Sequence, residues 1–423
     1  MSARRIYLDH SATTPLEPKV LEAMMPFLTD KFGNPNSIHS FGQEALTGVD
    51  EARQILADFL NCQTSEIVFT SGATEANNLA IRGLIKALKK RRGDDYKMHI
   101  ITSSIEHPAI LEPCRELERQ GIEVTYLPVD RKGIIKMGAL EKSIKDNTVL
   151  VSIMYVNNEV GSVQPIRKIG KLIKKINEKR DREWRNTRVS ERGQRPEPIY
   201  FHTDAVQAVN FFNCDVAWNY IDMLSLSGHK IYGPKGIGAL YVREGVPIYP
   251  IELGGHQERN RRSGTLNVPG IVGLGAAIKL LGKRRDKGNI TTKQEKYNKK
   301  ISCLRDRLVK GILANIPQAK LNTDLNDSTP AHANFIFPGV EGESVLLLLD
   351  LEGIAVSTGS ACASSNLEAS HVLLAMGIKK EIAHSSIRFT LGRHTTSVQI
   401  DKVIRVLPPI IKKLRNISTE WNE

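Results

Sequence analysis

Short apolar runs alternate with amphipathic stretches along the first part of the chain. Residues 73–88 repeat apolar positions at helical spacing, and residues 108–121 do so between Pro108 at the start and Gly121 at the end. Strands that alternate with helices predict βα units and a mostly parallel sheet with helices on both faces. We therefore expect an α/β fold. The strand-like runs are 66–72, 98–107, 122–130, 148–159, 198–206, 223–230 and 236–243.

The pattern changes after residue 262. Long helical stretches at 268–285 and 294–316 lead to shorter strand-like runs at 332–339 and 385–392, and then to a last helix. A chain of 423 residues is long enough for two or three domain-sized units with a sizeable core. We predict a larger domain at 16–262 and a smaller α/β domain made of 1–15 and 263–423.

Polar side chains follow several of the strand-like runs at the point where each run ends. Parallel α/β sheets bind ligands at the carboxyl ends of their strands, so we expect these side chains to lie around one site. They are Thr74, His107, Asn158, Asp204 and Lys230.

Lys230 stands out among them because it follows a strand and a Ser-Gly-His turn. A lysine fixed there can form a Schiff base with an aldehyde cofactor, although the commonest fate of a lysine is the solvated surface. Asp204 and Gln207 lie one strand upstream, and an acidic residue suits a pyridinium nitrogen. The turn 71–74 offers backbone N–H groups for a phosphate. Each motif alone is weak, but their combination in this order is much more specific.

The stretch Val356 to Ser365, VSTGSACASS, places Cys362 among Gly, Ser and Ala. Structural cysteines prefer packed apolar sites, whereas reactive ones need exposure. On composition alone the two interpretations are equally supported. The five cysteines are odd in number and contain no C-x-x-C, which argues against disulfides and a zinc site. We expect the remaining four, Cys62, Cys114, Cys214 and Cys303, to be core or inert.

The chain has an ordinary composition, with 41% hydrophobic and 25% charged residues and a net charge of +13. Residues 167–195 hold twelve Lys/Arg against four Asp/Glu. Aromatic residues there are few, so we interpret this segment as a solvated helix followed by a polar surface insertion at 180–198 and do not expect direct nucleic-acid binding. No apolar run approaches the ~20 residues of a membrane span, and the first residues do not resemble a targeting peptide. We expect a cytoplasmic protein that holds no metal.

Motifs along nearly the whole chain resemble those of the NifS/IscS-like cysteine desulfurases. They are YLDHSATTP, FGNPNSIHS, FTSGATEANN, EHPAILEPC, VNNEVGSVQP, HTDAVQA, SLSGHKIYGPKGIGALY, GGHQERNRRSGTLN, STGSACASS and HSSIRFTLGR. The resemblance implies a pyridoxal-5'-phosphate (PLP) enzyme of the class V aminotransferase type, with the aspartate aminotransferase-like fold type I. Its larger domain would hold the cofactor on a mostly parallel seven-stranded sheet. Its smaller domain would carry a catalytic cysteine loop at about 356–367.

The resemblance also implies roles for individual residues. Lys230 would hold the cofactor and then move protons, and His107 would stack on the cofactor ring and assist. Asp204 would pair with the ring nitrogen and Gln207 with the ring hydroxyl, while Asn158 and Arg388 would hold the substrate carboxylate. Phosphate contacts would come from Ala73, Thr74, Ser227, His229 and, from the second subunit of a homodimer, Thr265.

The implied reaction turns L-cysteine into L-alanine and leaves a persulfide on Cys362. A loop of small residues could carry that sulfur to acceptor proteins for iron–sulfur cluster assembly or tRNA thiolation. Two other interpretations remain open. One is another reaction on the same fold, such as selenocysteine cleavage or transamination. The other is an inactive partner that binds nucleic acid or a scaffold through its basic surface. Taken alone, Asn158 could cap a turn and Arg388 could form an ion pair on a strand.

Overall fold

A computed structural model describes residues 5–187, 195–282, 290–358 and 369–418. Its strands are β1 (Ile6–Tyr7), β2 (Ile67–Thr70), β3 (His99–Ser103), β4 (Glu123–Leu127), β5 (Thr148–Ser152), β6 (Tyr200–Asp204), β7 (Met223–Ser227), β8 (Gly238–Val242), β9 (Lys320–Leu321), β10 (His332–Ile336), β11 (Ile354–Ala355) and β12 (Ser386–Thr390). The helices include α1 (Pro18–Thr29), α2 (Ser40–Leu60), α3 (Ala73–Asn78), α4 (Leu84–Arg92), α5 (Pro108–Arg119), α6 (Met137–Ser143), α7 (Ile166–Asn186) and α8 (Val216–Asn219). They continue with α9 (Gln257–Asn260), α10 (Val268–Leu281), α11 (Thr292–Asn315), α12 (Gly342–Leu351), α13 (His371–Ala375), α14 (Lys380–Ala383) and α15 (Ser397–Ile417).

The largest sheet has seven strands in the order β2-β8-β7-β6-β5-β3-β4. The pairs among β3, β4, β5, β6 and β7 are parallel, and β8 is antiparallel to both of its neighbours. The mostly parallel seven-stranded sheet that the sequence predicts is therefore confirmed. The strands end where the polar residues of the sequence motifs begin.

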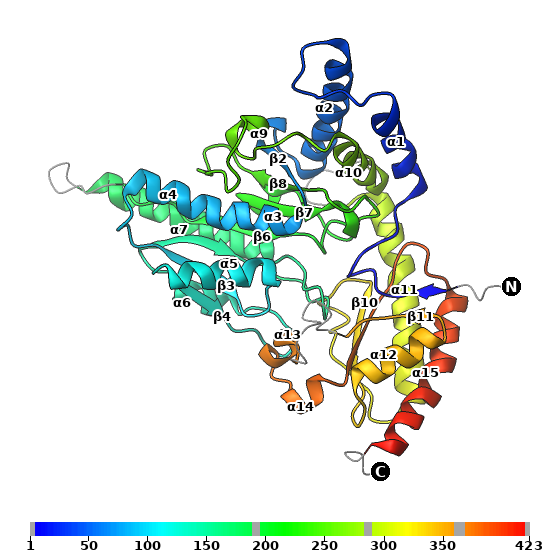
Figure 1. The fold of residues 1–423 in the computed structure, drawn as a ribbon. Helices are drawn as coiled ribbons and strands as arrows, with labels where there is room; N and C mark the ends of the chain where they lie inside the picture. The colour runs from blue at the N-terminus through cyan, green and yellow to red at the C-terminus, as the bar shows by residue number, and fades with distance from the viewer. Residues whose placement is uncertain (1–4, 188–194, 283–289, 359–368, 419–423) are drawn as a thin grey trace.

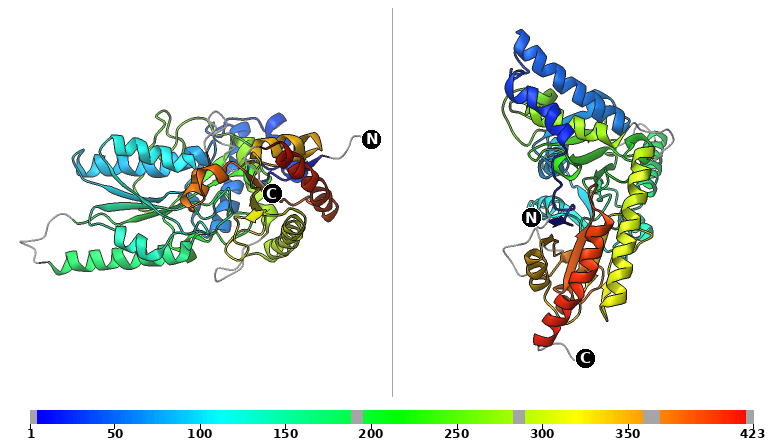
Figure 2. Two further views of the ribbon diagram at one scale, coloured as in Figure 1. Left: turned by 90° about the horizontal axis from the view of Figure 1, so that it is seen from below. Right: turned by 90° about the vertical axis from the view of Figure 1, so that its right-hand side faces the viewer.

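Helices cover both faces of this sheet, as expected for buried parallel strands. Ile67 and Phe69 of β2 join a core cluster with α2, α7 and α10, whereas Val68 between them joins a second cluster with α3, α4 and α5. Figure 2 shows α7 along one face, with the sky-blue and cyan helices α4 and α5 on the other. No helix in the described ranges is both long and apolar enough to cross a membrane.

Smaller sheets lie beside this layer, together with α11, α12 and α15 (Figure 1). In one, β10 lies between β9 and β12 and is antiparallel to both, and in the other β1 is parallel to β11. Ile6 and Leu8 from the start of the chain join the core cluster of these elements. The first residues thus pack with the elements of the smaller sheets, while the division into domains at residue 262 stays a prediction. Side chains of α10 pack in the core of the larger sheet.

The polar insertion expected at 180–198 is in part regular structure. Helix α7 continues to Asn186, and Arg180 on it donates to the carbonyl oxygens of Thr148 and Lys145. Glu197 is buried and accepts hydrogen bonds from Arg91 and Arg92 at the end of α4. The segment is therefore helical and mostly exposed as far as residue 186, and the surface interpretation was wrong for the buried Glu197.

Candidate functional site

Lys230 ends a 3₁₀ turn, Gly228–Lys230, that follows β7 directly. The turn is tight, because a Cβ on Gly228 would lie 2.9 Å from the carbonyl oxygen of Pro234. Asn210 donates to the backbone carbonyl of Lys230 at 2.8 Å, which fixes the residue from a second side. The Lys230 amine donates to the carbonyl oxygens of Ser11 and Ala12, the second at 2.6 Å. The amine is thus held against the N-terminal segment.

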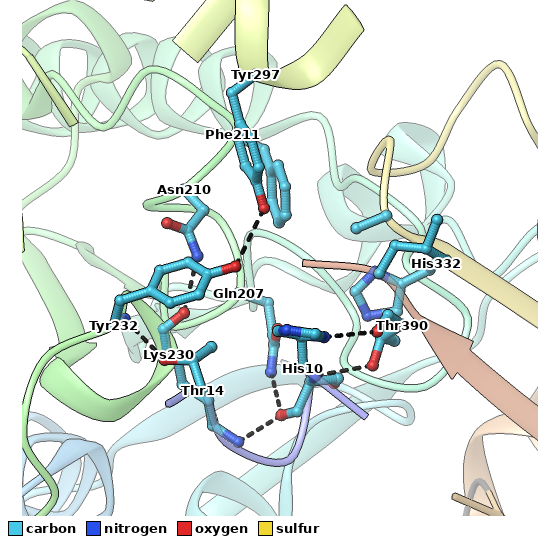
Figure 3. Close-up of a pocket in the computed structure, with 13 residues that line it drawn as sticks. His10, Thr14, Gln207, Asn210, Phe211, Lys230, Tyr232, Tyr297, His332 and Thr390 are labelled. Carbon is cyan, nitrogen blue, oxygen red and sulfur yellow. Dashed lines mark hydrogen bonds between the residues drawn. The ribbon is translucent and has the colours of Figure 1, made fainter. Parts of the chain in front are cut away.

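Asp204 and Gln207 lie at and just beyond the end of β6. The Asp204 carboxylate is 7% exposed and accepts from Asn77 Nδ2 at 2.8 Å. Gln207 Nε2 donates to the Ser11 carbonyl at 3.0 Å, the same oxygen that accepts from Lys230 (Figure 3). Asn77 is the one side chain that donates a hydrogen bond to this carboxylate among the described contacts. The carboxylate can therefore still accept a hydrogen bond from a protonated ring nitrogen.

His107 is the N-cap of α5, where its Nδ1 accepts from the backbone N–H of Ala109 at 3.1 Å. Its neutral ring therefore carries the proton on Nε2. Burial lowers the pKa of His107, the Asp204 carboxylate raises it, and Lys230 lowers it again. These three side chains thus act on one another electrostatically, and His107 is neutral near pH 7.

Strand β8 lies between β2 and β7 in the sheet, and the polar residues that follow β2 and β7 lie on its two sides. Gly72 precedes α3 without any side-chain cap, and a Cβ on it would meet nothing within 4 Å. Ala73 and the exposed Thr74 begin that helix, and Asn77 ties it to Asp204. Because the helix start has no side-chain cap, the backbone N–H groups of its first turn could bind an anion.

On the β7 side of strand β8 stand Ser227, which is buried, and His229. His229 Nδ1 lies 3.1 Å from Thr13 Oγ1. Burial, with help from Lys230 and Lys235, lowers the pKa of His229 to about 4, so the ring is neutral and can donate one hydrogen bond.

Arg388 lies on β12 of the smaller sheet and reaches the larger unit. Its guanidinium donates to the backbone carbonyl of Asn158 at 3.1 Å and to the Asp9 carboxylate at 2.7 Å. Arg388 is 3% exposed, and its Nε atom has no hydrogen-bond partner among the described residues. Ser11 Oγ also donates to the Asn158 carbonyl, at 2.6 Å. The structure therefore brings Asn158 and Arg388 together, as predicted, and adds Asp9 to them.

Two predicted residues are not joined to this group. Cys362 lies outside the described residues, and Thr265 is exposed in the connection between α9 and α10. The described chain nevertheless approaches the site on both sides of Cys362. Ser357 pairs with Arg388 through two backbone hydrogen bonds, and His371 Nε2 donates to the Glu106 carbonyl at 2.9 Å.

The N-terminal segment 9–14 is the part of the site that residue-by-residue reasoning did not single out. Its Asp9, Ser11, Ala12 and Thr13 contact Arg388, Asn158, Lys230 and His229. The only signal in the sequence is the polar run DHSATT directly after a short strand-like stretch. A small pocket lies beside this segment (Figure 3). It is lined by His10, Ser11, Thr14, Gln207, Asn210, Phe211, Lys230, Tyr232, Tyr297, Ala331, His332, Thr390 and Leu391.

The other cysteines differ in environment. Burial raises the pKa of Cys62, Cys114 and Cys214 to about 12, so these thiols stay protonated, as an inert role requires. Cys303 is exposed on α11, so it is not a core residue, and its inertness stays a prediction. The described residues contain no group of three or more His, Cys, Asp or Glu side chains suited to a metal ion.

The buried Glu106 next to His107 predicts an unusual pH dependence of stability. Its carboxyl accepts from Ser103 Oγ and the Met154 N–H, and burial raises its pKa to about 8. Between about pH 4.5 and 8 the folded state holds a proton that the unfolded state has released, so the free energy of unfolding falls as pH rises through this window. We expect Glu106→Gln to remove a slope of up to about 1.4 kcal/mol per pH unit, measured from urea midpoints.

The control for this prediction is Glu116→Gln on the exposed face of α5. Hydrogen bonds from Gln120 and Arg119 lower the pKa of Glu116, so its titration lies below the window. Its stability curve should run parallel to that of the parent protein. A Glu106→Gln curve that does the same would contradict the prediction.

Comparison with known proteins adds a family to this geometry. The family Aminotransferase class-V matches residues 6–179 and 188–403. The chain is 46% identical to "Cysteine desulfurase IscS" of Dictyoglomus turgidum over 421 residues, which cover 99% of this chain and 98% of that protein. It is 48% identical to "Cysteine desulfurase IscS" of Methanosarcina thermophila, with 98% and 94% covered.

Solved structures with the same fold are similar along nearly the whole chain. A "NifS-like protein" superposes with a TM-score of 0.82 at 36% identity and covers 98% of this chain and 99% of its own. The structure titled "SspA in complex with cysteine" has a TM-score of 0.75 at 37% identity, with 92% of this chain and 100% of that chain covered. The fold type expected from the motifs is therefore confirmed.

Proposed function

Because the chain belongs to the class-V aminotransferase family, and within it to the cysteine desulfurases, we propose that it removes the sulfur of L-cysteine and leaves a persulfide on Cys362. The proposal rests on one observation above all. Arg388, a suitable carboxylate ligand, shares a hydrogen-bond network with Lys230 through Asn158 and the N-terminal residue Ser11. An amino acid bound by its carboxylate at Arg388 would lie within this network.

The protein is a PLP-dependent enzyme, and the residues present fit that cofactor. A buried carboxylate at Asp204, an amine at Lys230 and an uncapped helix start at Gly72 match a pyridinium nitrogen, an aldehyde and a phosphate. When bound, PLP supplies an electron sink that eases removal of the α-proton of an amino acid. Ala73, Thr74, Ser227 and His229 would bind its phosphate, Gln207 its hydroxyl, and His107 one face of its ring.

The chain's own groups would then divide the work. Arg388 would bind the substrate carboxylate through its forked guanidinium, and Asn158 would orient it. The Lys230 amine would take and return the proton at the substrate Cα, and the His107 ring with its Nε2 proton would assist. The Cys362 thiolate would attack the substrate sulfur, so that one S–S bond forms and one C–S bond breaks. Carbon gains a proton, and the products are L-alanine and the Cys362 persulfide.

The two described ends of the segment that contains Cys362 support this assignment. Ser357 lies beside Arg388, and Ser370 and His371 contact the turns that carry Asn158 and His107. Both described ends of this segment thus lie next to residues that we assign to the substrate site. We propose that the sulfur on Cys362 passes to acceptor proteins for iron–sulfur cluster assembly or tRNA thiolation.

A homodimer is part of this proposal. Thr265 makes no hydrogen bond within the described part of the chain and is free to reach the phosphate of a second subunit. Large exposed apolar side chains, which need a covering surface, lie on and near α1. They include Leu21, Met25, Leu28, Phe32, Ile38 and Phe41. We further propose a cytoplasmic location, in which the cysteines stay reduced, and no direct binding of nucleic acid.

Arg388→Lys tests the assignment of the carboxylate ligand. Lysine keeps the charge but lacks the fork, so kcat/KM for L-cysteine should fall roughly 10- to 100-fold, mostly through KM. Arg307→Lys is the matched control, because Arg307 forms a two-point ion pair with Asp401 on the exposed surface of the smaller unit. Steady-state alanine production measures both. An unchanged KM in Arg388→Lys would place the carboxylate elsewhere.

The proposed function itself is tested by mixing the PLP-loaded protein with L-cysteine. Alanine is quantified while peptide mass spectrometry follows every cysteine. We expect a gain of one sulfur on the Cys362 peptide, equal in amount to the alanine formed in a single turnover. Alanine without a modified Cys362 would assign the nucleophile to another group. Neither product, from protein that carries PLP, would exclude L-cysteine as the substrate.

A further inference from the structure

Helix α13 (His371–Ala375) packs on the two turns that hold His107 and Asn158. Its Val372 and Leu373 form a small apolar cluster with Ile105, Met154 and Val160, which belong to the connections after β3 and β5. Figure 1 shows α13 in orange at this edge of the seven-stranded sheet. The first described residues after Cys362 are therefore part of the packing around the site.

Two polar contacts fix the start of this helix. Ser370, its N-cap, accepts from the Leu373 N–H at 3.2 Å and donates its own hydroxyl proton to the Glu159 carboxylate. The ring of His371 donates to the Glu106 carbonyl at 2.9 Å. The hydroxyl of Ser370 thus accepts one hydrogen bond from its own helix and donates another to Glu159 in the turn after β5.

Glu159 is an unusual partner for a helix cap. It follows Asn158 directly, is 4% exposed, and donates its own N–H to Asn157 Oδ1 at 2.9 Å. A serine needs no buried acid to cap a helix, and burying a carboxyl has a cost unless it is hydrogen-bonded. Burial raises the pKa of Glu159 to about 7, and the positive charge of Arg388 acts in the opposite direction. The carboxyl therefore interacts with both Arg388 and Ser370.

We propose that Glu159 and Ser370 form an anchor that ties the chain just after Cys362 to the turn that orients the substrate. Ser370 is eight residues beyond Cys362 in the sequence. Both are positioning residues, which act through the placement of Cys362 and not by touching the reacting atoms. The inference rests on the proposed function, because it assigns to the anchor an effect on sulfur transfer to Cys362.

The physical reason is effective concentration. A segment fixed at both ends samples a smaller volume than one fixed at a single end, so a thiol on it meets the substrate sulfur more often. Without the Ser370 hydroxyl, α13 loses both its cap and its bond to Glu159. The residues that bind the substrate carboxylate, Arg388 and Asn158, keep their own contacts. The loss should therefore appear in sulfur transfer and not in substrate binding.

The test uses full-length, PLP-loaded protein in single-turnover reactions with L-cysteine. The change in cofactor absorbance with L-cysteine concentration gives the affinity, and quenched mass spectrometry gives the rate of persulfide formation on Cys362. We expect Ser370→Ala to slow persulfide formation about tenfold, while the affinity stays within about twofold. Ser370→Thr keeps the hydroxyl and should restore most of the rate. Adding Glu159→Ala to Ser370→Ala should cause little further loss, because the two residues share one bond.

Thr396→Ala is the matched control. Thr396 caps α15 and accepts from the Gln399 N–H at 3.3 Å, far along the chain from the turns after β3 and β5. It loses a helix cap of the same kind and should keep the parent rate. The anchor is refuted if Ser370→Ala forms persulfide at the parent rate, or if its affinity falls as much as its rate. A parent protein that forms no persulfide on Cys362 would overturn the proposed function first, and this inference with it.

Discussion

Lys230→Ala is expected to abolish the covalent attachment of PLP and to lower alanine production roughly a thousandfold or more, because one amine serves both steps. In the structure that amine is held by the carbonyl oxygens of Ser11 and Ala12, at the end of a turn in which a side chain on Gly228 would have no space. No neighbouring lysine is set in such a position by the described contacts. The loss of the absorbance band of lysine-bound PLP and the rate of alanine formation measure the two effects.

Lys168→Ala provides the control for this change. Lys168 is exposed on α7, on the outer side of the helix, and should keep both the absorbance band and the rate. If Lys230→Ala retained the band, the cofactor would be attached to another lysine. If it lost the band yet made alanine at the parent rate, the proton transfers would belong to a different group.

Cys362→Ser is expected to separate cofactor chemistry from sulfur transfer. The variant should bind PLP and respond to L-cysteine with an absorbance change, since Lys230, Asp204 and Arg388 are intact. A hydroxyl is a far weaker nucleophile than a thiolate toward sulfur, so catalytic alanine production should fall roughly a hundredfold or more. Mass spectrometry should find no persulfide on the 356–365 stretch.

Cys303→Ser is the matched control, because Cys303 is the exposed thiol on α11. The Cys303→Ser variant should make alanine at the parent rate. In the parent protein, Cys303 itself should gain no sulfur. Full activity in Cys362→Ser, with sulfur found on Cys303 or at no cysteine, would contradict the assignment. The buried thiols are poor alternatives, because burial keeps the pKa of Cys114 and Cys214 at about 12.

The larger sheet could be predicted because its signals are local. Each apolar run that we interpreted as a strand contains one, from Ile67–Thr70 to Gly238–Val242. Strands that are buried on both faces appear in the sequence as nearly continuous apolar runs, which are easy to recognise. The polar residues at the strand ends followed from the same argument. Asp204, His107 and Lys230 act on one another electrostatically, as a common edge requires.

Helix α7 shows where local reasoning failed. Residues 180–186 carry almost no apolar side chains and resembled a polar loop. Ion pairs one turn apart, Lys179 with Glu183 and Arg185 with Asp181, support the helix there. Arg180 on this helix donates to the carbonyl oxygens of Thr148 and Lys145, which lie at or near the start of β5 and over thirty residues earlier in the chain. The periodicity of the sequence does not reveal such a long-range contact.

The rest of the site could not be predicted residue by residue because its contacts join distant parts of the chain. Asp9 and Arg388, or Glu159 and Ser370, become neighbours only in the folded molecule. A lone acid such as Glu159 looks like a surface residue in the sequence, yet it is buried. The roles of Gln207 and Thr265 came from the resemblance and stay predictions until they are measured.

Asp9 and Arg388, which form an ion pair in the folded protein, are synthesised at very different times on the ribosome. Lys230 and its turn emerge early enough to meet Ser11 while most of the smaller unit has not yet been made. Arg388 emerges 158 residues after Lys230. At ribosomal speeds this gap lasts roughly 8 to 30 seconds. During that interval a nascent chain could carry the lysine but no complete substrate site, so sulfur release would begin only once nearly the whole polypeptide had been translated.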